Sequence, residues 1–116
     1  MLTKEAIMAA VDIAVETVHV PEWGGDVKVR GLTGAQRDQY EQMLLGQREK
    51  SGAFYNIRAT LCVLAIVDDN GNQLFDVAEI DALGKKSAAA LDRIADVIRR
   101  ISGLAPEAVE DAEKNL

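Results

Sequence analysis

The apolar residues of the chain change their spacing several times, and each change indicates a different element. Residues 15–20 alternate between apolar and polar side chains, which is typical of a β-strand with one buried face. Residues 26–30 alternate in the same way. Between them, Pro21 cannot donate to a strand ladder, and residues 22–25 contain two glycines suited to a turn. The pattern therefore predicts an N-terminal β-hairpin.

Helical spacing dominates three other stretches, and each begins with a side chain that can cap a helix. Thr3, Thr33 and Ser87 can each accept a hydrogen bond from a free N–H group of the first turn. Thr33 and Gln36 also match a capping box, in which each side chain bonds the backbone of the other residue. The predicted helices carry Ile7, Met8 and Val11 in the first, Tyr40, Met43 and Leu44 in the second, and Leu91, Ile94, Ile98 and Ile101 in the third.

Residues that disfavour helix indicate where these three helices end. We expect the first to end near Asp12, the second at Ser51 and Gly52, and the third at Gly103. Residues 105–116 follow, with a proline able to begin one last turn, and we expect them to be partly mobile.

The third helix also has a polar face. Arg99 and Arg100 belong to it, opposite the apolar stripe. Asp96 and Arg100 are four residues apart, the spacing at which opposite charges on a helix can pair. We therefore expect an ion pair between them.

The middle of the chain leaves two interpretations open. Phe54, Ile57, Leu61 and Leu64 have helical spacing and predict one face of a further helix. The sequence becomes so apolar at residues 61–67 that a buried helix end and a short strand fit equally well. Periodicity alone does not distinguish them.

A second turn signal follows at residues 68–72, where Asn and Gly tolerate the positive φ of a tight hairpin. It predicts a second short hairpin across residues 65–75. Asp76 and Glu79 then match another capping box, ahead of a short helix that Gly84 would close.

Together these elements predict an α+β fold. A chain of 116 residues lies within the usual range of one domain, so we expect a single domain over residues 1–116. It would contain the N-terminal hairpin and the second short hairpin, packed with three to five helices. Because aromatic residues make up only 4% of the chain, aliphatic side chains must fill most of the core.

The charge of the chain excludes two classes of partner. A formal net charge of -6 disfavours binding to nucleic acid or to an acidic membrane surface, since both depend on clustered Lys and Arg. No apolar run approaches the ~20 residues of a membrane span, and the N-terminal stretch lacks the core of a signal peptide. We therefore expect a cytoplasmic protein without nucleic-acid or membrane partners.

The residues needed for catalysis are scarce. His19 is the only histidine, so it has no second histidine with which to hold a metal ion. Cys62 is the only cysteine, which fits a reducing compartment, and its apolar surroundings would raise the pKa of the thiol. A catalytic pair of these two residues would need the fold to bring them together, and buried packing of Cys62 is the simpler interpretation. The sequence predicts no enzyme, no catalytic residue, no cofactor and no metal site.

Residues 68–79 support one alternative function. They place oxygen-bearing side chains at the first, third, fifth, ninth and twelfth positions of an EF-hand calcium loop, namely Asp68, Asn70, Asn72, Asp76 and Glu79. The sixth position of such a loop needs glycine for a sharp turn, and here it holds Gln73. The alternative is therefore a small calcium-binding regulatory domain whose melting temperature rises with calcium.

Several segments carry a family resemblance through their order along the chain. A Pro-Glu-Trp-Gly-Gly turn at residues 21–25 leads into a strand, a Leu-Thr turn at residues 32–33 and a polar helix. An acidic Asn-Gly turn followed by Leu-Phe occupies residues 67–75, and an Ile-Ser-Gly-Leu segment at residues 101–104 ends the last amphipathic helix. Lys-Asn stands near the end, at residues 114–115. In these features nearly the whole chain resembles the tail assembly chaperones of long-tailed, siphovirus-type bacteriophages.

This resemblance implies a nonenzymatic protein of the infected host's cytoplasm that is absent from the mature virion. Such a chaperone binds the tape measure protein, keeps it soluble and helps to recruit tail tube subunits. Family members are often made in two lengths by a ribosomal frameshift, and this chain would be the short form. Self-association into a homo-oligomer is left open.

Aromatic residues are the candidates for contact with such a partner, because aromatic anchors dominate interface energetics. Trp23 lies at the predicted hairpin turn, and Phe54 and Tyr55 lie at the junction of two predicted helices. Packing in the core is the alternative for each, and helical spacing favours it for Phe54. A third hypothesis, a regulatory subunit of an enzyme, has no residue in its favour.

Overall fold

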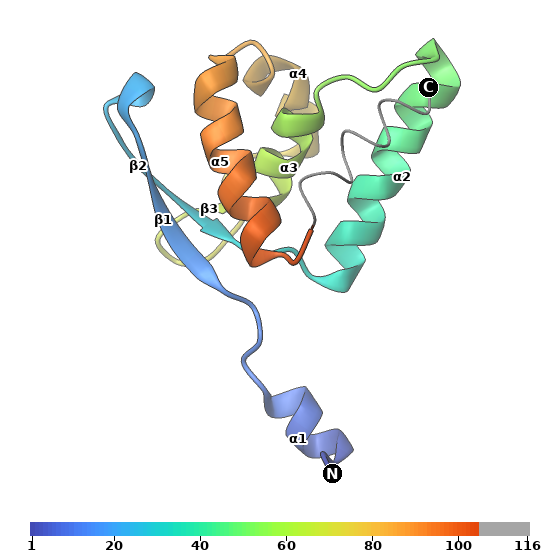
Figure 1. The fold of residues 1–116 in the computed structure, drawn as a ribbon, viewed down its shortest axis with the longest axis vertical. Helices are drawn as coiled ribbons and strands as arrows, with labels where there is room; N and C mark the ends of the chain where they lie inside the picture. The colour runs from blue at the N-terminus through green and yellow to red at the C-terminus, as the bar shows by residue number, and fades with distance from the viewer. Residues whose placement is uncertain (105–116) are drawn as a thin grey trace.

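A three-stranded antiparallel sheet and two helices form the centre of the molecule, and a long third helix covers the side away from the sheet (Figure 1). The computed structural model describes residues 1–104. The sheet has the order β1-β2-β3, with strands β1 (Val15–Val20), β2 (Gly25–Arg30) and β3 (Ile66–Val67). The helices are α1 (Lys4–Ala9), α2 (Gly34–Ser51), α3 (Ile57–Ala65), α4 (Ile80–Leu83) and α5 (Ala88–Ile101), with two 3₁₀ turns, η1 (Pro21–Trp23) and η2 (Val77–Glu79). The predicted α+β class is confirmed.

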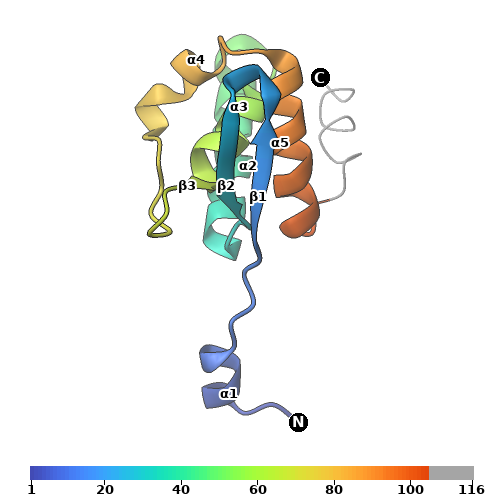
Figure 2. The same ribbon diagram turned by 90° about the vertical axis from the view of Figure 1, so that its left-hand side faces the viewer.

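The predicted N-terminal hairpin is also confirmed. β1 and β2 pair with Val18 opposite Val27 and Val20 opposite Gly25. Figure 2 shows the sheet lying across the helices. Val18 and Val20 are buried because every second side chain of β1 faces these helices. The turn is η1, and Gly24 completes it with a φ of +69°, a left-handed conformation that glycine adopts without steric cost.

α3 is the buried centre of the fold. All of its residues except Arg58 are buried, and it packs against α2, α4 and α5. The helix ends at Ala65, and the chain continues directly into β3, where Ile66 lies opposite Val29 of β2. Both interpretations of residues 61–67 are therefore correct in part, because residues 61–65 end a buried helix and residues 66–67 form a short strand.

The hydrogen bonds of the predicted helix caps are present. Thr3, Thr33 and Ser87 each accept a hydrogen bond from the backbone N–H three residues further on. α2 also has the complete capping box, and it ends at Ser51 before Gly52, whose φ is +75°. Local sequence therefore determines where these helices begin and where α2 ends.

The start of α3 differs from the prediction. Phe54 lies before the helix, because Asn56 directly ahead of Ile57 has a positive φ of 52° and interrupts the helical path. Assigning Phe54 to the same helical face as Ile57 was therefore wrong. Phe54 nevertheless packs half-buried against the core from its loop.

Gly84 follows α4 for a different reason than the sequence suggested. Its φ is −62°, which is helical and not left-handed. A Cβ at this position would meet the side-chain amide of Asn56, which donates to Asp81 of α4. A glycine here therefore leaves room for the Asn56 side chain beside α4.

Two predictions about the polar face of α5 were wrong. Arg99 is only 7% exposed, and its guanidinium pairs with Asp96 at 3.0 Å. Arg100 pairs with Glu16 of β1. Because β1 lies alongside α5, it offers Arg100 a carboxylate that helical spacing alone does not reveal.

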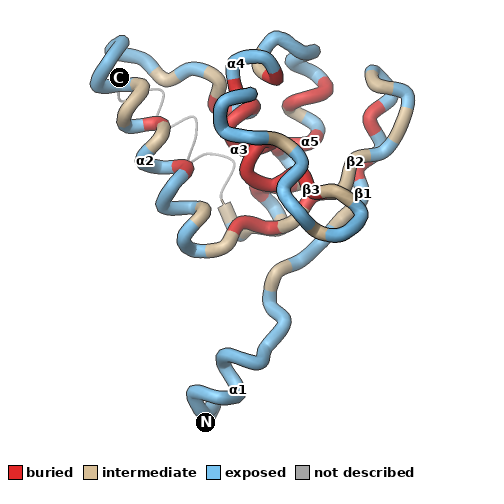
Figure 3. The backbone as a smooth tube through the Cα atoms, turned by 180° about the vertical axis from the view of Figure 1, so that it is seen from behind, coloured by how far each residue is buried: buried red, intermediate tan, exposed pale blue. Residues whose placement is uncertain are grey.

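α1 stands apart from the rest of the molecule (Figure 1). It ends at Ala9, earlier than the predicted position near Asp12, and none of its residues is buried (Figure 3). Ile7 and Met8 are 57% and 78% exposed. An isolated helix needs ~12–15 residues to be even marginally stable in water, and α1 has 6.

Within residues 1–104 the structure contains no helix long and apolar enough to cross a membrane. The expected mobility of residues 105–116 concerns a segment outside the described residues.

Candidate docking groove

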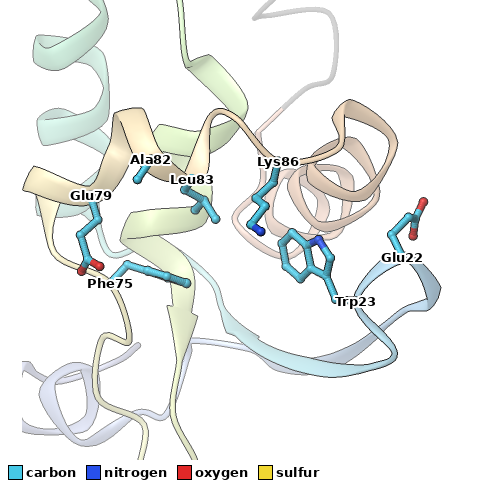
Figure 4. Close-up of a pocket in the computed structure, with 7 residues that line it drawn as sticks. All are labelled: Glu22, Trp23, Phe75, Glu79, Ala82, Leu83 and Lys86. Atoms are coloured by element: carbon cyan, nitrogen blue, oxygen red, sulfur yellow. The ribbon is translucent and has the colours of Figure 1, made fainter.

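A largely apolar cavity of about 530 Å³ lies between the turn of the N-terminal hairpin, α4 and the segment ahead of η2. Figure 4 shows Trp23, Phe75 and Leu83 pointing into this space. Its volume falls within the range of protein sites that bind ligands or large side chains. The lining residues are Glu22, Trp23, Phe75, Glu79, Ala82, Leu83 and Lys86, and we call this site the Trp23 groove.

The hairpin turn places Trp23 at the groove. Pro21 begins the 3₁₀ turn, and the left-handed Gly24 ends it directly after Trp23. Glu22 points away from the groove and pairs with Arg93 of α5, which holds the turn against that helix (Figure 4). The hydrogen bond to Arg93 keeps the pKa of the Glu22 carboxyl below its ordinary value. Trp23 is therefore half-buried. It packs against the core and also lines the groove.

The second hairpin places Phe75 on the other side of the groove. Its turn is stabilised by the Asp68 carboxylate, which accepts hydrogen bonds from the N–H groups of Asn70 and Asn72 at 2.8 and 3.0 Å. Beyond the turn, the N–H of Leu74 donates to the carbonyl of Ile66 at 3.1 Å. The predicted short hairpin is thereby confirmed.

The capping box that follows fixes the wall beyond Phe75. The backbone N–H of Asp76 donates to Glu79 at 2.9 Å, and the Asp76 side chain accepts from the backbone of Glu79 in return. This arrangement starts η2 and directs α4 along the groove. Leu83 of α4 contributes the apolar floor.

A second hollow of about 480 Å³ adjoins the Trp23 groove and shares Phe75 and Glu79 with it. Leu74 and Val77 line this hollow and are 53% and 41% exposed. The two hollows therefore form one continuous surface with exposed apolar side chains. Such a surface is suited to bind apolar side chains of a protein partner.

The sequence and the fold were compared with known proteins. No protein-family model and no curated protein matches the sequence. Among solved structures, the bacteriophage HK97 tail assembly chaperone matches with a TM-score of 0.57. The match covers 89% of this chain and 92% of that chain at 20% sequence identity.

This chain has the fold of a tail assembly chaperone. The predicted resemblance is therefore confirmed for the fold, over nearly the whole chain. At 20% identity the alignment itself assigns no role to individual residues, so the site must be argued from the geometry of this chain.

Within this chaperone fold, the three aromatic candidates lie in two different places. Trp23 lines the groove, whereas Phe54 and Tyr55 belong to the loop between α2 and α3, outside the groove lining. Tyr55 is 47% exposed, and its backbone N–H donates to Gln47 of α2. The structure thus does not bring Trp23 together with the other two.

The two residues considered for catalysis are also separated. Cys62 is fully buried in α3, and burial raises the pKa of its thiol to about 12. His19 is exposed on the outer face of β1, where its Nδ1 lies 2.7 Å from Asp26. Because a thiol without solvent access cannot meet an exposed imidazole, the Cys62 and His19 pair does not form.

The geometry of residues 68–79 gives the calcium hypothesis no support. Asp68 stabilises its own turn, and Asp76 and Glu79 form the capping box. In residues 1–104 no group of three or more His, Cys, Asp or Glu residues is gathered where it could hold a metal ion. The hairpin and cap interpretation of this segment accounts for its polar residues.

Sequence analysis missed the groove residues contributed by the second hairpin and α4. Phe75 directly follows a strong turn signal, and Leu74 and Val77 lie on either side of Phe75 and Asp76. An apolar cluster that runs from a turn into a capping box is therefore the signal that indicates this wall of the groove. The proximity of Trp23 to these residues depends on the tertiary fold.

Proposed function

We propose that this chain is a tail assembly chaperone of a long-tailed, siphovirus-type bacteriophage. It binds the tape measure protein, keeps that protein soluble and helps to recruit tail tube subunits. The observation that best supports this proposal is the likeness of fold to the HK97 tail assembly chaperone, which covers 89% of this chain. The protein acts in the host cytoplasm and leaves before the virion matures.

The Trp23 groove is the contact site for the client in this proposal. Trp23 and Phe75 offer aromatic surface from opposite sides, and Leu83 supplies an apolar floor. Aromatic residues held by a rigid surround make strong anchors, because little side-chain entropy is lost when a partner binds. A long apolar client needs such surface while it waits for assembly.

A second, smaller contact involves the loop between α2 and α3. Tyr55 is exposed there, and the preceding Phe54 packs against the core. In this proposal Tyr55 touches a partner directly and Phe54 supports the loop. Two separate contact points suit a chaperone that bridges a client and a tube subunit.

Self-association through α1 completes the proposal. Copies bound along one long client lie next to each other, and α1 extends from each copy with its apolar side chains uncovered. Packing on a neighbouring copy would provide the tertiary contacts that this 6-residue helix lacks. Many weak contacts along the client then add up to tight but reversible coating.

Co-expression tests the proposal. The tape measure protein of the phage that encodes this chain is expressed alone and together with this chain, and its soluble fraction is measured after centrifugation. We expect it to aggregate alone and to become soluble in a complex that contains both proteins.

A second co-expression with Trp23→Ala provides the site-specific arm. We expect this variant to remain folded, as measured by circular dichroism, and to leave the tape measure protein insoluble. If wild-type chain leaves the tape measure protein insoluble and forms no complex with it, the proposed function is wrong.

A further inference from the structure

The segment that forms one wall of the Trp23 groove is strongly acidic. Residues 68–84, which we call the acidic lobe, contain five carboxylates and no Lys or Arg. They are Asp68, Asp69, Asp76, Glu79 and Asp81. This lobe includes the second hairpin, η2, α4 and the glycine that follows them.

Cations lie beside the lobe, since the Arg30 guanidinium donates to the carbonyl of Gly71 at 3.3 Å and Lys86 lines the Trp23 groove. None of the ion pairs in residues 1–104 involves a carboxylate of the acidic lobe. Asp68, Asp76 and Glu79 accept hydrogen bonds from backbone N–H groups, and Asp81 accepts one from the Asn56 amide. These partners are neutral, and the five carboxylates outnumber the neighbouring Arg30 and Lys86, so the lobe keeps a net negative field toward solvent.

Apolar side chains are exposed on the same lobe. Leu74 and Val77 flank Phe75 and Asp76 in sequence and line the hollow that adjoins the Trp23 groove. Glu79 borders both hollows. A surface that combines exposed apolar side chains with carboxylates matches a partner whose apolar stripe lies between cationic side chains.

We propose that the Trp23 groove and the acidic lobe together bind an amphipathic α-helix whose apolar stripe is flanked by Lys or Arg. This proposal rests on the proposed function, in which the client is the tape measure protein, and specifies which segments of that client are bound. The apolar stripe packs on Trp23, Phe75 and Leu74, and the flanking cations face Asp76 and Glu79. Electrostatic attraction speeds the encounter and selects basic segments over neutral or acidic ones.

The test uses Trp23 itself as the reporter, because it is the only tryptophan of the chain. Three tryptophan-free peptides of about 18 residues, about 27 Å long as helices, share one leucine stripe. Their flanking positions hold Lys, Gln or Glu. Each is titrated into the full chain while Trp23 fluorescence is followed, and calorimetry provides an independent dissociation constant.

We expect the Lys peptide to bind about 10-fold or more tighter than the Gln peptide, and the Glu peptide to bind most weakly. Trp23 emission should shift to shorter wavelength on binding, since the indole leaves water. Raising the salt concentration should reduce the advantage of the Lys peptide because exposed charges are screened.

A charge-neutral variant tests the residues responsible. Asp76→Asn with Glu79→Gln keeps side chains that can form the capping box while removing two charges. Asp38→Asn with Glu49→Gln removes two charges from exposed positions of α2 and is the matched control. The first pair should abolish most of the preference for the Lys peptide, and the second should preserve it.

Three results would overturn the proposal, and each has a distinct meaning. Equal affinity for the three peptides would show that the groove binds helices without regard to charge. Absence of binding to any peptide would show that the groove does not take helices. Tighter binding after deletion of residues 2–12 would show that α1 of a second copy is the natural occupant. None of these outcomes decides whether the tape measure protein is solubilised, so the proposed function is tested separately by co-expression.

Discussion

The carboxylate of Glu16 on β1 lies 2.6 Å from the guanidinium of Arg100 near the end of α5. A second pair, Glu22 with Arg93, joins the turn of the same hairpin to the same helix. The hairpin that carries Trp23 is therefore held against α5 at both ends. Exposed pairs of this kind are screened by solvent and contribute little to stability, so their main effect is to fix the position of the hairpin.

These pairs make stability depend on pH in a defined direction. The hydrogen bond from Arg100, followed by its positive charge, lowers the pKa of Glu16 in the folded protein. A group with a lowered folded pKa stabilises the protein fully above its ordinary, unfolded pKa, and this contribution is lost as pH falls through the folded pKa. We expect the midpoint of urea denaturation to decrease at pH values below this ordinary pKa, and to decrease less in Glu16→Gln.

Glu49→Gln, at an exposed position on α2, is the control for this series. It should follow the wild-type pH profile. A Glu16→Gln profile that coincides with the wild type over the whole acidic range would contradict the assigned pair.

Cys62 should be inert toward thiol reagents in the native protein. Its thiol is fully buried and has a pKa of about 12, so almost no thiolate exists at neutral pH. We predict that labelling with a chromogenic disulfide reagent proceeds at the rate of unfolding and becomes fast in denaturant. Rapid labelling of native protein would mean that α3 is not the closed centre of the fold.

Replacing Leu61 by Ala should be strongly destabilising. Leu61 is fully buried in α3, and removing such a side chain from a packed core costs about 2–5 kcal/mol. Leu45→Ala on α2, where the leucine is 53% exposed, should change the free energy of unfolding by less than about 1 kcal/mol. Urea denaturation of the two variants measures this difference, and similar losses at both positions would contradict the assigned core.

Deletion of residues 2–12 should leave the melting temperature unchanged, because no residue of α1 is buried. The same deletion should convert any oligomer of the purified protein into monomer, as measured by light scattering coupled to size-exclusion chromatography. An unchanged oligomer would show that α1 does not join the copies. A large fall in melting temperature would show that α1 packs on its own domain.

The elements predicted well from sequence are those determined by local chemistry. Thr33 and Gln36 form the expected capping box, and alternation along residues 15–20 predicted the strand that β1 forms. Such features depend on residues a few positions apart, so one sequence is enough to predict them.

Other failures arose where distant segments meet. Arg100 pairs with Glu16 across 84 positions of sequence, and local spacing suggested Asp96 instead. The groove has the same origin, since Trp23 and Phe75 come from separate hairpins. Trp23 could be singled out as an aromatic residue at a turn, but its neighbours across the groove could not.

The most direct test of the central claim compares two leucines with the same exposure. Leu74 borders the proposed docking surface and Leu45 lies on α2, and both are 53% exposed. The dissociation constant of the complex with the tape measure protein is measured for wild type, Leu74→Ser and Leu45→Ser. The account predicts about 10-fold or more weaker binding for Leu74→Ser and no change for Leu45→Ser. Equal affinities for the two variants, or no complex with the wild-type chain, would contradict it.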